Sequence, residues 1–288
     1  MNGRRAVRFY TAGMQRRFSQ VDGFTADPYF GNPCAVVLDG DGLDTERMKL
    51  FARWTNLSET TFLLPPNEPS ADYRVRIFTP VAELPFAGHP TLASCHAWLE
   101  AGGSPKAGEI VQQCEAGLIR IRRSPGEIAF AAPPLVRSGP VDERLNERLA
   151  AVLGIERSAI VDTQWVDNGP GWVAALLEDA AAVLAVKPGY DTLDVGLVGP
   201  HPAGHETAFE VRAFFPKDGA MVEDPVTGSL NASLAEWLLR TGRAEAPYVA
   251  SQGAALRRNG RVRIVQDDDG TIWVGGGTVT CISGTAEL

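Results

Sequence analysis

The sequence contains one pattern twice, and this repeat is the feature that most restricts how the chain can fold. Val-Arg-Ile-Phe-Thr-Pro at 75–80 recurs 136 residues later as Val-Arg-Ala-Phe-Phe-Pro at 211–216. Glu-Leu-Pro-Phe-Ala-Gly-His at 83–89 recurs 140 residues later as Glu-Asp-Pro-Val-Thr-Gly-Ser at 223–229, which fits a four-residue insertion at 217–220. A weaker third match joins Gly-Asn-Pro at 31–33 with Asn-Gly-Pro at 168–170. Three matches in one order predict two halves with the same plan of strands, turns and helix.

The repeat places the boundary between the two halves near Pro133 and Pro134. We therefore expect a first domain over residues 14–133 and a second over residues 134–277. A strand near 278–288 is a candidate to complete the first domain. Residues 1–13 show no clear hydrophobic period, and we expect them to form an extension.

Short β-branched and aromatic runs, separated by Gly and Pro, predict that both halves are rich in strands. Residues 90–99 and 230–239 differ, because they are apolar around most of a helical circumference and must be enclosed if they form helices. In a β-rich half the enclosing element is a curved sheet. The prediction is an α+β fold of two similar halves related by a pseudo-two-fold axis, each a β-barrel or strongly curved sheet around a central helix. Amphipathic or capped helices are expected at Asp44 to Asn56 and, with Asp142 as cap and Gly154 as end, over 142–153.

Charge and composition exclude several partners. The net charge of -8 and the absence of clustered Lys and Arg argue against a nucleic-acid partner. No segment approaches the roughly 18 consecutive apolar residues of a membrane span. We expect a cytoplasmic protein with reduced thiols and no metal site, because its cysteines lack zinc-ligand spacing. They are Cys34, Cys95, Cys114 and Cys281.

The starts of the two expected buried helices form a candidate binding site. His89 and Ser229 occupy matching places there, where unpaired backbone N–H groups and the helix dipole favour an anion. Gly88 and Gly228 allow a ligand to approach the backbone closely. If the two helix starts face one cleft, they hold a small anionic, carboxylate-bearing substrate between the halves. Two further motif residues, Asn32 and Thr227, are also expected to bind the substrate.

Two carboxylates are expected at this cleft. Glu59 lies between the helix expected to end at Asn56 and a strand, and Asp224 lies in the turn before the second buried helix. The repeat aligns Leu84 with Asp224 and aligns no Glu with Glu59, so each half supplies one carboxylate. A carboxyl that is partly desolvated has a raised pKa, which suits a group that must take and return a proton. Taken singly, each of these residues is more often a helix end, a cap or a turn residue than a catalytic group.

These motifs together resemble the phenazine-biosynthesis isomerase (PhzF-like) family, over a match from about Phe18 to Leu288. The resemblance implies the fold of diaminopimelate epimerase. It also implies that Glu59 is the proton-shuttling glutamate, and that His89, Asp224 and Ser229 complete the catalytic set. In the phenazine enzyme the reaction is isomerisation of trans-2,3-dihydro-3-hydroxyanthranilate. The motifs lie at 22–24, 31–33, 56–60, 76–80, 84–90 and 223–229.

The resemblance favours an isomerase that needs no cofactor and forms a homodimer. A two-thiol racemase is disfavoured, because the nearest cysteine to a helix start is Cys95 and its counterpart in the repeat is Ala235. Two alternatives stay open: an amino-acid or hydroxy-acid epimerase or racemase, and a non-catalytic small-molecule binding protein of the same fold. Family membership does not fix the substrate.

Overall fold

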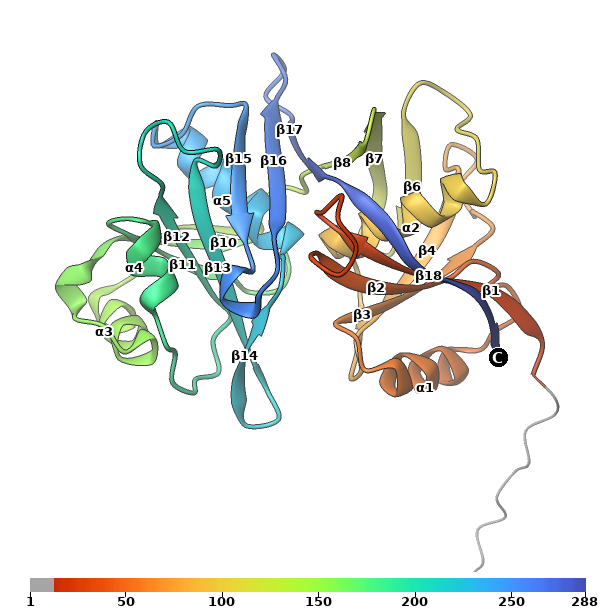
Figure 1. Cartoon of the computed structure of the whole chain (residues 1–288), viewed down its shortest axis with the longest axis horizontal. Coiled ribbons are helices and arrows are strands. Elements are labelled where there is room, and N and C mark those ends of the chain that lie inside the picture. The colour runs from red at the N-terminus through yellow and green to blue at the C-terminus, as the bar shows by residue number, and fades with distance from the viewer. Residues whose placement is uncertain (1–12) are drawn as a thin grey trace, which may run out of the picture.

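The computed structural model describes residues 13–288, and its eighteen strands form one continuous hydrogen-bonded sheet. The expected extension at residues 1–13 lies outside the described residues, apart from Gly13. Figure 1 shows two groups of elements side by side, with the last strand of the chain returning to the first group. No helix in residues 13–288 has the length and apolar character needed to cross a bilayer.

The two groups are made of the following elements. The first contains β1 (Gln15–Gly23), β2 (Asn32–Val37), α1 (Thr45–Thr55), β3 (Glu59–Leu64), β4 (Tyr73–Phe78), β5 (Glu83–Leu84), α2 (Gly88–Glu100), β6 (Ile110–Cys114), β7 (Gly117–Ser124), β8 (Glu127–Ala131) and β18 (Thr278–Glu287). The second contains β9 (Arg137–Pro140), α3 (Glu143–Leu153), β10 (Ile160–Asp167), β11 (Val173–Leu177), α4 (Ala180–Ala185), β12 (Val195–Pro200), β13 (Phe209–Lys217), β14 (Ala220–Asp224), α5 (Gly228–Arg240), β15 (Tyr248–Gln252), β16 (Gly260–Gln266) and β17 (Ile272–Gly276).

The repeated sequence folds with a repeated order of strand pairing. In the first group β1 pairs antiparallel with β2, β2 parallel with β3, β3 antiparallel with β4, and β4 parallel with β6. In the second group β10, β11, β12, β13 and β15 pair in the same senses. β18 lies against β1 as β9 lies against β10, and β8 joins the groups by pairing with β17. The insertion at 217–220 forms the tip of a longer β13–β14 hairpin.

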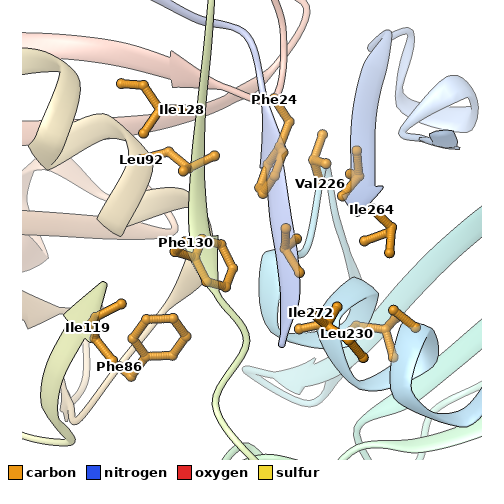
Figure 2. Close-up of a cluster of buried hydrophobic side chains, with 14 of the residues drawn as sticks. Phe24, Phe86, Leu92, Ile119, Ile128, Phe130, Val226, Leu230, Ile264 and Ile272 are labelled. Carbon is orange, nitrogen blue, oxygen red and sulfur yellow. The ribbon is translucent and has the colours of Figure 1, made fainter. Parts of the chain in front are cut away.

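The two helices expected to be enclosed, α2 and α5, are buried along most of their length. Figure 2 shows the apolar side chains between them, with Leu92 of α2 and Phe130 of β8 on one side and Leu230 of α5 and Ile272 of β17 on the other. This cluster runs without interruption from one group to the other. Because buried apolar surface contributes about 25 cal/mol per Å², the shared core holds the two helices in a fixed relation.

The helices α1 and α3 lie on the outside and are capped as expected. Asp44 and Asp142 each accept a hydrogen bond from the backbone N–H three residues later, and Gly154 ends α3 in the left-handed conformation. Asn56 ends α1 with a φ of 54°, and the chain then enters β3 at Glu59. The left-handed end of α1 thus places Glu59 at the start of a strand that runs beside α2.

Candidate active site

The helices α2 and α5 begin against each other. A Cβ atom placed on Gly88, the first residue of α2, would lie 2.7 Å from the Cα of Gly228, the first residue of α5. The reverse substitution would bring a Cβ at Gly228 to 2.8 Å from the Cα of Gly88. Real Cβ atoms essentially never approach backbone that closely, so only glycine at both positions lets the two N-termini meet. The junction gathers the unpaired N–H groups and the positive dipole ends of both helices.

Glu59 and His89 face each other at this junction. Oε2 of Glu59 lies 3.1 Å from Nε2 of His89, and the side chains are 14% and 5% exposed. The geometry falls short of a hydrogen bond, and neither atom has a hydrogen-bond partner elsewhere in residues 13–288. Burial raises the pKa of Glu59 well above its usual value, and the nearby Asp224 raises it further. Burial lowers the pKa of His89 to about 3, so the imidazole is neutral at neutral pH.

Asn32 connects His89 of the first group to Asp224 of the second. Its amide Nδ2 donates to Oδ1 of Asp224 at 2.9 Å and to the carbonyl of Val226 at 2.9 Å, and lies 3.2 Å from Nδ1 of His89. The amide carries two hydrogens for these three acceptors, so the contact with Nδ1 does not fix which ring nitrogen of His89 carries the hydrogen.

Asp224 is the second buried carboxylate of the site. Its Oδ2 accepts a 2.5 Å hydrogen bond from the hydroxyl of Thr227. Burial raises the pKa of Asp224 to about 6, although the hydrogen bonds from Thr227 and Asn32 oppose the shift. Two carboxylates with raised pKa values therefore lie near one neutral histidine, an arrangement typical of acid/base sites.

Ser229 occupies the place in α5 that His89 occupies in α2. Its Oγ accepts a 3.1 Å hydrogen bond from Nε1 of Trp172, and its backbone carbonyl accepts a 3.0 Å bond from Asn168. The residue is 9% exposed. The loop that contains the weak repeat match at 168–170 thus holds the start of α5 through Asn168 and Trp172.

The structure brings together most of the residues that the sequence predicted. Glu59, His89 and Asp224 form one cluster, Asn32 and Thr227 bind Asp224, and Gly88 and Gly228 touch; Ser229 lies beside Gly228 but contacts Trp172 instead of His89. The roles of these residues in catalysis and substrate binding stay predictions.

Sequence reasoning missed Gln252 and Asn231. Oε1 of Gln252 accepts from the backbone N–H of Thr227 at 3.0 Å and from Asn231 at 2.9 Å, while its Nε2 donates to the backbone carbonyl of Asp224 at 3.2 Å. It therefore holds the turn between β14 and α5. The predicted motif ends at Ser229, and no spacing signal in the sequence links it to β15.

The structure has cavities of about 550, 470, 540 and 300 Å³ in residues 13–288, and the residues that line these four do not include the predicted catalytic set. Within the same residues no group of three or more His, Cys, Asp or Glu side chains is arranged to hold a metal ion.

A family model described as "Phenazine biosynthesis-like protein" matches residues 21–284. The chain belongs to this family. It is 35% identical over 240 residues to the trans-2,3-dihydro-3-hydroxyanthranilate isomerase of Pseudomonas aeruginosa, covering 81% of this chain and 82% of that protein. It is 33% identical to an uncharacterized isomerase of Pasteurella multocida, over 91% of each chain. Like these relatives, this protein is an isomerase.

Solved structures agree with this family. A PhzF-family protein of Enterococcus faecalis superposes with a TM-score of 0.76 at 25% identity, covering 96% of this chain and 100% of that one. A structure described as a predicted epimerase of Pseudomonas aeruginosa superposes with a TM-score of 0.77 at 26% identity, covering 95% and 99%. A hydroxyproline epimerase of Agrobacterium vitis, with a TM-score of 0.60 at 13% identity over 95% and 93%, shares the fold alone.

Proposed function

We propose that this isomerase moves a carbon-bound proton on a small carboxylate-bearing substrate, with Glu59 as the acid/base group. The single observation that carries the proposal is the position of Glu59, 3.1 Å from a neutral His89 and beside the junction of two helix N-termini. The proposal includes two barrel-like halves related by a pseudo-two-fold axis, residues 14–133 completed by β18 and residues 134–277, with the substrate between them.

The helix junction supplies the part of the site that recognises the substrate. Backbone N–H groups at the starts of α2 and α5 bind the substrate carboxylate, because the helix dipoles place partial positive charge there. Ser229 adds a hydroxyl whose oxygen already accepts from Trp172, so its hydrogen remains for the substrate.

The proton transfer follows from the charges of the cluster. In its ionised form Glu59 removes a proton from a carbon atom of the substrate and becomes a neutral carboxylic acid, the form that its buried position favours. The carboxyl proton of Glu59 exchanges with solvent, and Glu59 then delivers a proton to another carbon of the same delocalised anion. His89 stays neutral and orients Glu59, while Asn32, itself held by Asp224, positions the His89 ring.

Trans-2,3-dihydro-3-hydroxyanthranilate is the first substrate to test, because it is named for a relative at 35% identity. The protein is incubated with this compound in D2O and the product is analysed by NMR. The proposal predicts deuterium at a carbon that did not carry the lost proton. The 26% identical structure described as a predicted epimerase favours a second candidate, an epimerase, which would return deuterium to the original carbon with inverted configuration. Ligand binding without any exchange contradicts both and indicates a binding protein.

We also propose that the protein acts as a homodimer in the cytoplasm. Light scattering of the purified protein tests the dimer, and a monomeric mass would contradict it.

A further inference from the structure

Asp194 occupies the place in the second group that Glu59 occupies in the first. Thr60 pairs with Phe78 in the first group, and Val195 pairs with Phe214 in the second. Phe78 and Phe214 are equivalent in the repeat, so Thr60 corresponds to Val195 and the residue before it, Glu59, corresponds to Asp194.

The two carboxylates also lie on equivalent faces of their strands. Side chains two residues apart on a strand point to the same side. In the first group Thr61 accepts a 2.9 Å hydrogen bond from Ser94 of α2, so the face that carries Glu59 looks toward α2. In the second group a Cβ on Gly196 would collide with the side chain of Leu230, so the face that carries Asp194 looks toward the start of α5.

The β11–β12 ladder brings Asp194 beside the residue that contacts Ser229. The backbone N–H of Val173 donates to the carbonyl of Asp194 at 3.0 Å, and the preceding residue, Trp172, donates its Nε1 to Oγ of Ser229 at 3.1 Å. In the described part of the chain the Asp194 carboxylate has neither a hydrogen-bond partner nor an ion pair. Partial burial, with a smaller effect from Asp167, raises the pKa of Asp194 to about 6. Nothing in the structure uses this half-buried acid.

We propose that Asp194 is a second acid/base group of the cleft, serving the Ser229 side of the substrate as Glu59 serves the His89 side. The inference rests on the proposed function for proton removal by Glu59, and it replaces the second step, in which Glu59 itself delivers the proton to the other carbon. In the forward step Glu59 accepts a carbon-bound proton as a carboxylate, and the protonated Asp194 delivers its own proton to a different carbon of the resulting anion. The C–H bond broken at one carbon is matched by the one formed at the other, and both carboxyl groups then return to their starting states by exchange with solvent. Two groups on opposite sides of the cleft also make inversion of a stereocentre chemically available.

The test separates proton removal from product formation. Wild type, Glu59→Gln, Asp194→Asn and the control Asp218→Asn, at an exposed hairpin tip, are incubated in D2O with trans-2,3-dihydro-3-hydroxyanthranilate. Deuterium in recovered substrate and the rate of product formation are both measured. We expect Asp194→Asn to keep substrate exchange within about threefold of wild type, while product formation falls about 100-fold, the lower range for loss of a general acid.

Each other outcome has a definite meaning. Unchanged product formation in Asp194→Asn overturns the inference and leaves Glu59 as the only shuttle. An equal fall of exchange and product formation assigns Asp194 a structural role and also overturns it. If Glu59→Gln retains both activities, the proposed function fails, whatever Asp194→Asn does.

A second measurement needs no turnover. Protein labelled with ¹³C at the Asp carboxyl carbons is titrated to saturation with anthranilate, the aromatic analogue of the test compound. The Asp194 signal, identified by its loss in Asp194→Asn, is expected to move, while the Asp218 signal stays in place. An Asp194 signal that does not move at saturation places this side chain outside the cleft and overturns the inference.

Discussion

Gly88 and Gly228 are in backbone contact, and this contact sets the distance between the two halves of the site. A Cβ on Gly88 would lie 2.7 Å from the Cα of Gly228, where neither backbone can yield easily. Gly88→Ala is therefore expected to push the helix starts apart, to lower the free energy of unfolding by about 1–3 kcal/mol and to reduce turnover by at least tenfold. Urea unfolding and steady-state kinetics measure the two effects. Gly284→Ala, which places a Cβ in open space, is the matched control and should resemble wild type.

Thr227 is expected to tune the ionisation of Asp224. Its hydroxyl donates the 2.5 Å hydrogen bond to Oδ2 of Asp224, which stabilises the ionised form. Thr227→Val keeps the shape and removes the donor, so the pKa of Asp224 should rise above its value of about 6, by roughly one unit. The carboxyl ¹³C signal of Asp224 should titrate at higher pH in Thr227→Val than in wild type, and Thr227→Ser should move the midpoint back. An unmoved midpoint in Thr227→Val would show that the Thr227 hydroxyl does not stabilise the ionised form of Asp224.

His89 is expected to make stability depend on pH. Its folded-state pKa of about 3 lies below the usual 6.5, so its contribution to stability is present above pH 6.5 and is lost as the pH falls toward 3. Between pH 7 and pH 5 the loss amounts to about 2 kcal/mol. The raised pKa of Asp224 acts in the opposite sense, but that contribution is common to wild type and variant.

Urea unfolding of His89→Gln at pH 7 and pH 5 isolates this effect. The fall in the free energy of unfolding between the two pH values should be about 2 kcal/mol smaller in the variant than in wild type. His205→Gln, which alters an exposed histidine, should keep the wild-type dependence. The same fall in all three proteins would show that the His89 imidazole is not buried in its neutral form.

β18 is expected to be essential for the first half. It pairs with the whole length of β1, from Gln15 with Glu287 to Gly23 with Thr278. Removing residues 278–288 leaves β1 with one edge unpaired, so soluble protein and cooperative unfolding should be lost. Trimming the exposed hairpin tip at 217–220, absent from the first half, should leave both intact. A truncated protein that still unfolds cooperatively would contradict the assignment of β18 to the first domain.

Much of the fold could be predicted from the sequence, because each motif of the repeat is a short continuous segment. The motifs at 75–80 and 211–216 became equivalent strands, and the apolar segments at 90–99 and 230–239 became the buried helices α2 and α5. Asp142 and Gly154 cap α3 as their residue types suggest. The correspondence of Leu84 with Asp224 is confirmed by the strand register, since Leu84 pairs with Ile77 and Asp224 with Ala213.

The long-range contacts of the site could not be predicted. Asn32 binds Asp224 across 192 residues of sequence, and only the packed fold brings them together. The equivalence of Asp194 with Glu59 was missed for two reasons. Residues of β12 lie 135 positions after their equivalents in β3, whereas residues of β13 lie 136 positions after their equivalents in β4. The second half also has Asp where the first has Glu. This one-residue shift hides the equivalence of Glu59 and Asp194 in the sequence, whereas the pairing of the strands shows it.

In the proposed reaction Glu59 carries the proton. The most direct measurement is the rate at which trans-2,3-dihydro-3-hydroxyanthranilate gains solvent deuterium in D2O with wild type, Glu59→Gln and Glu59→Asp. The amide of Glu59→Gln fits the site but cannot accept a proton, so the rate should fall by about 1,000-fold, and the shorter acid in Glu59→Asp should restore part of it. Deuterium uptake by Glu59→Gln at the wild-type rate would show that a group other than Glu59 removes the proton.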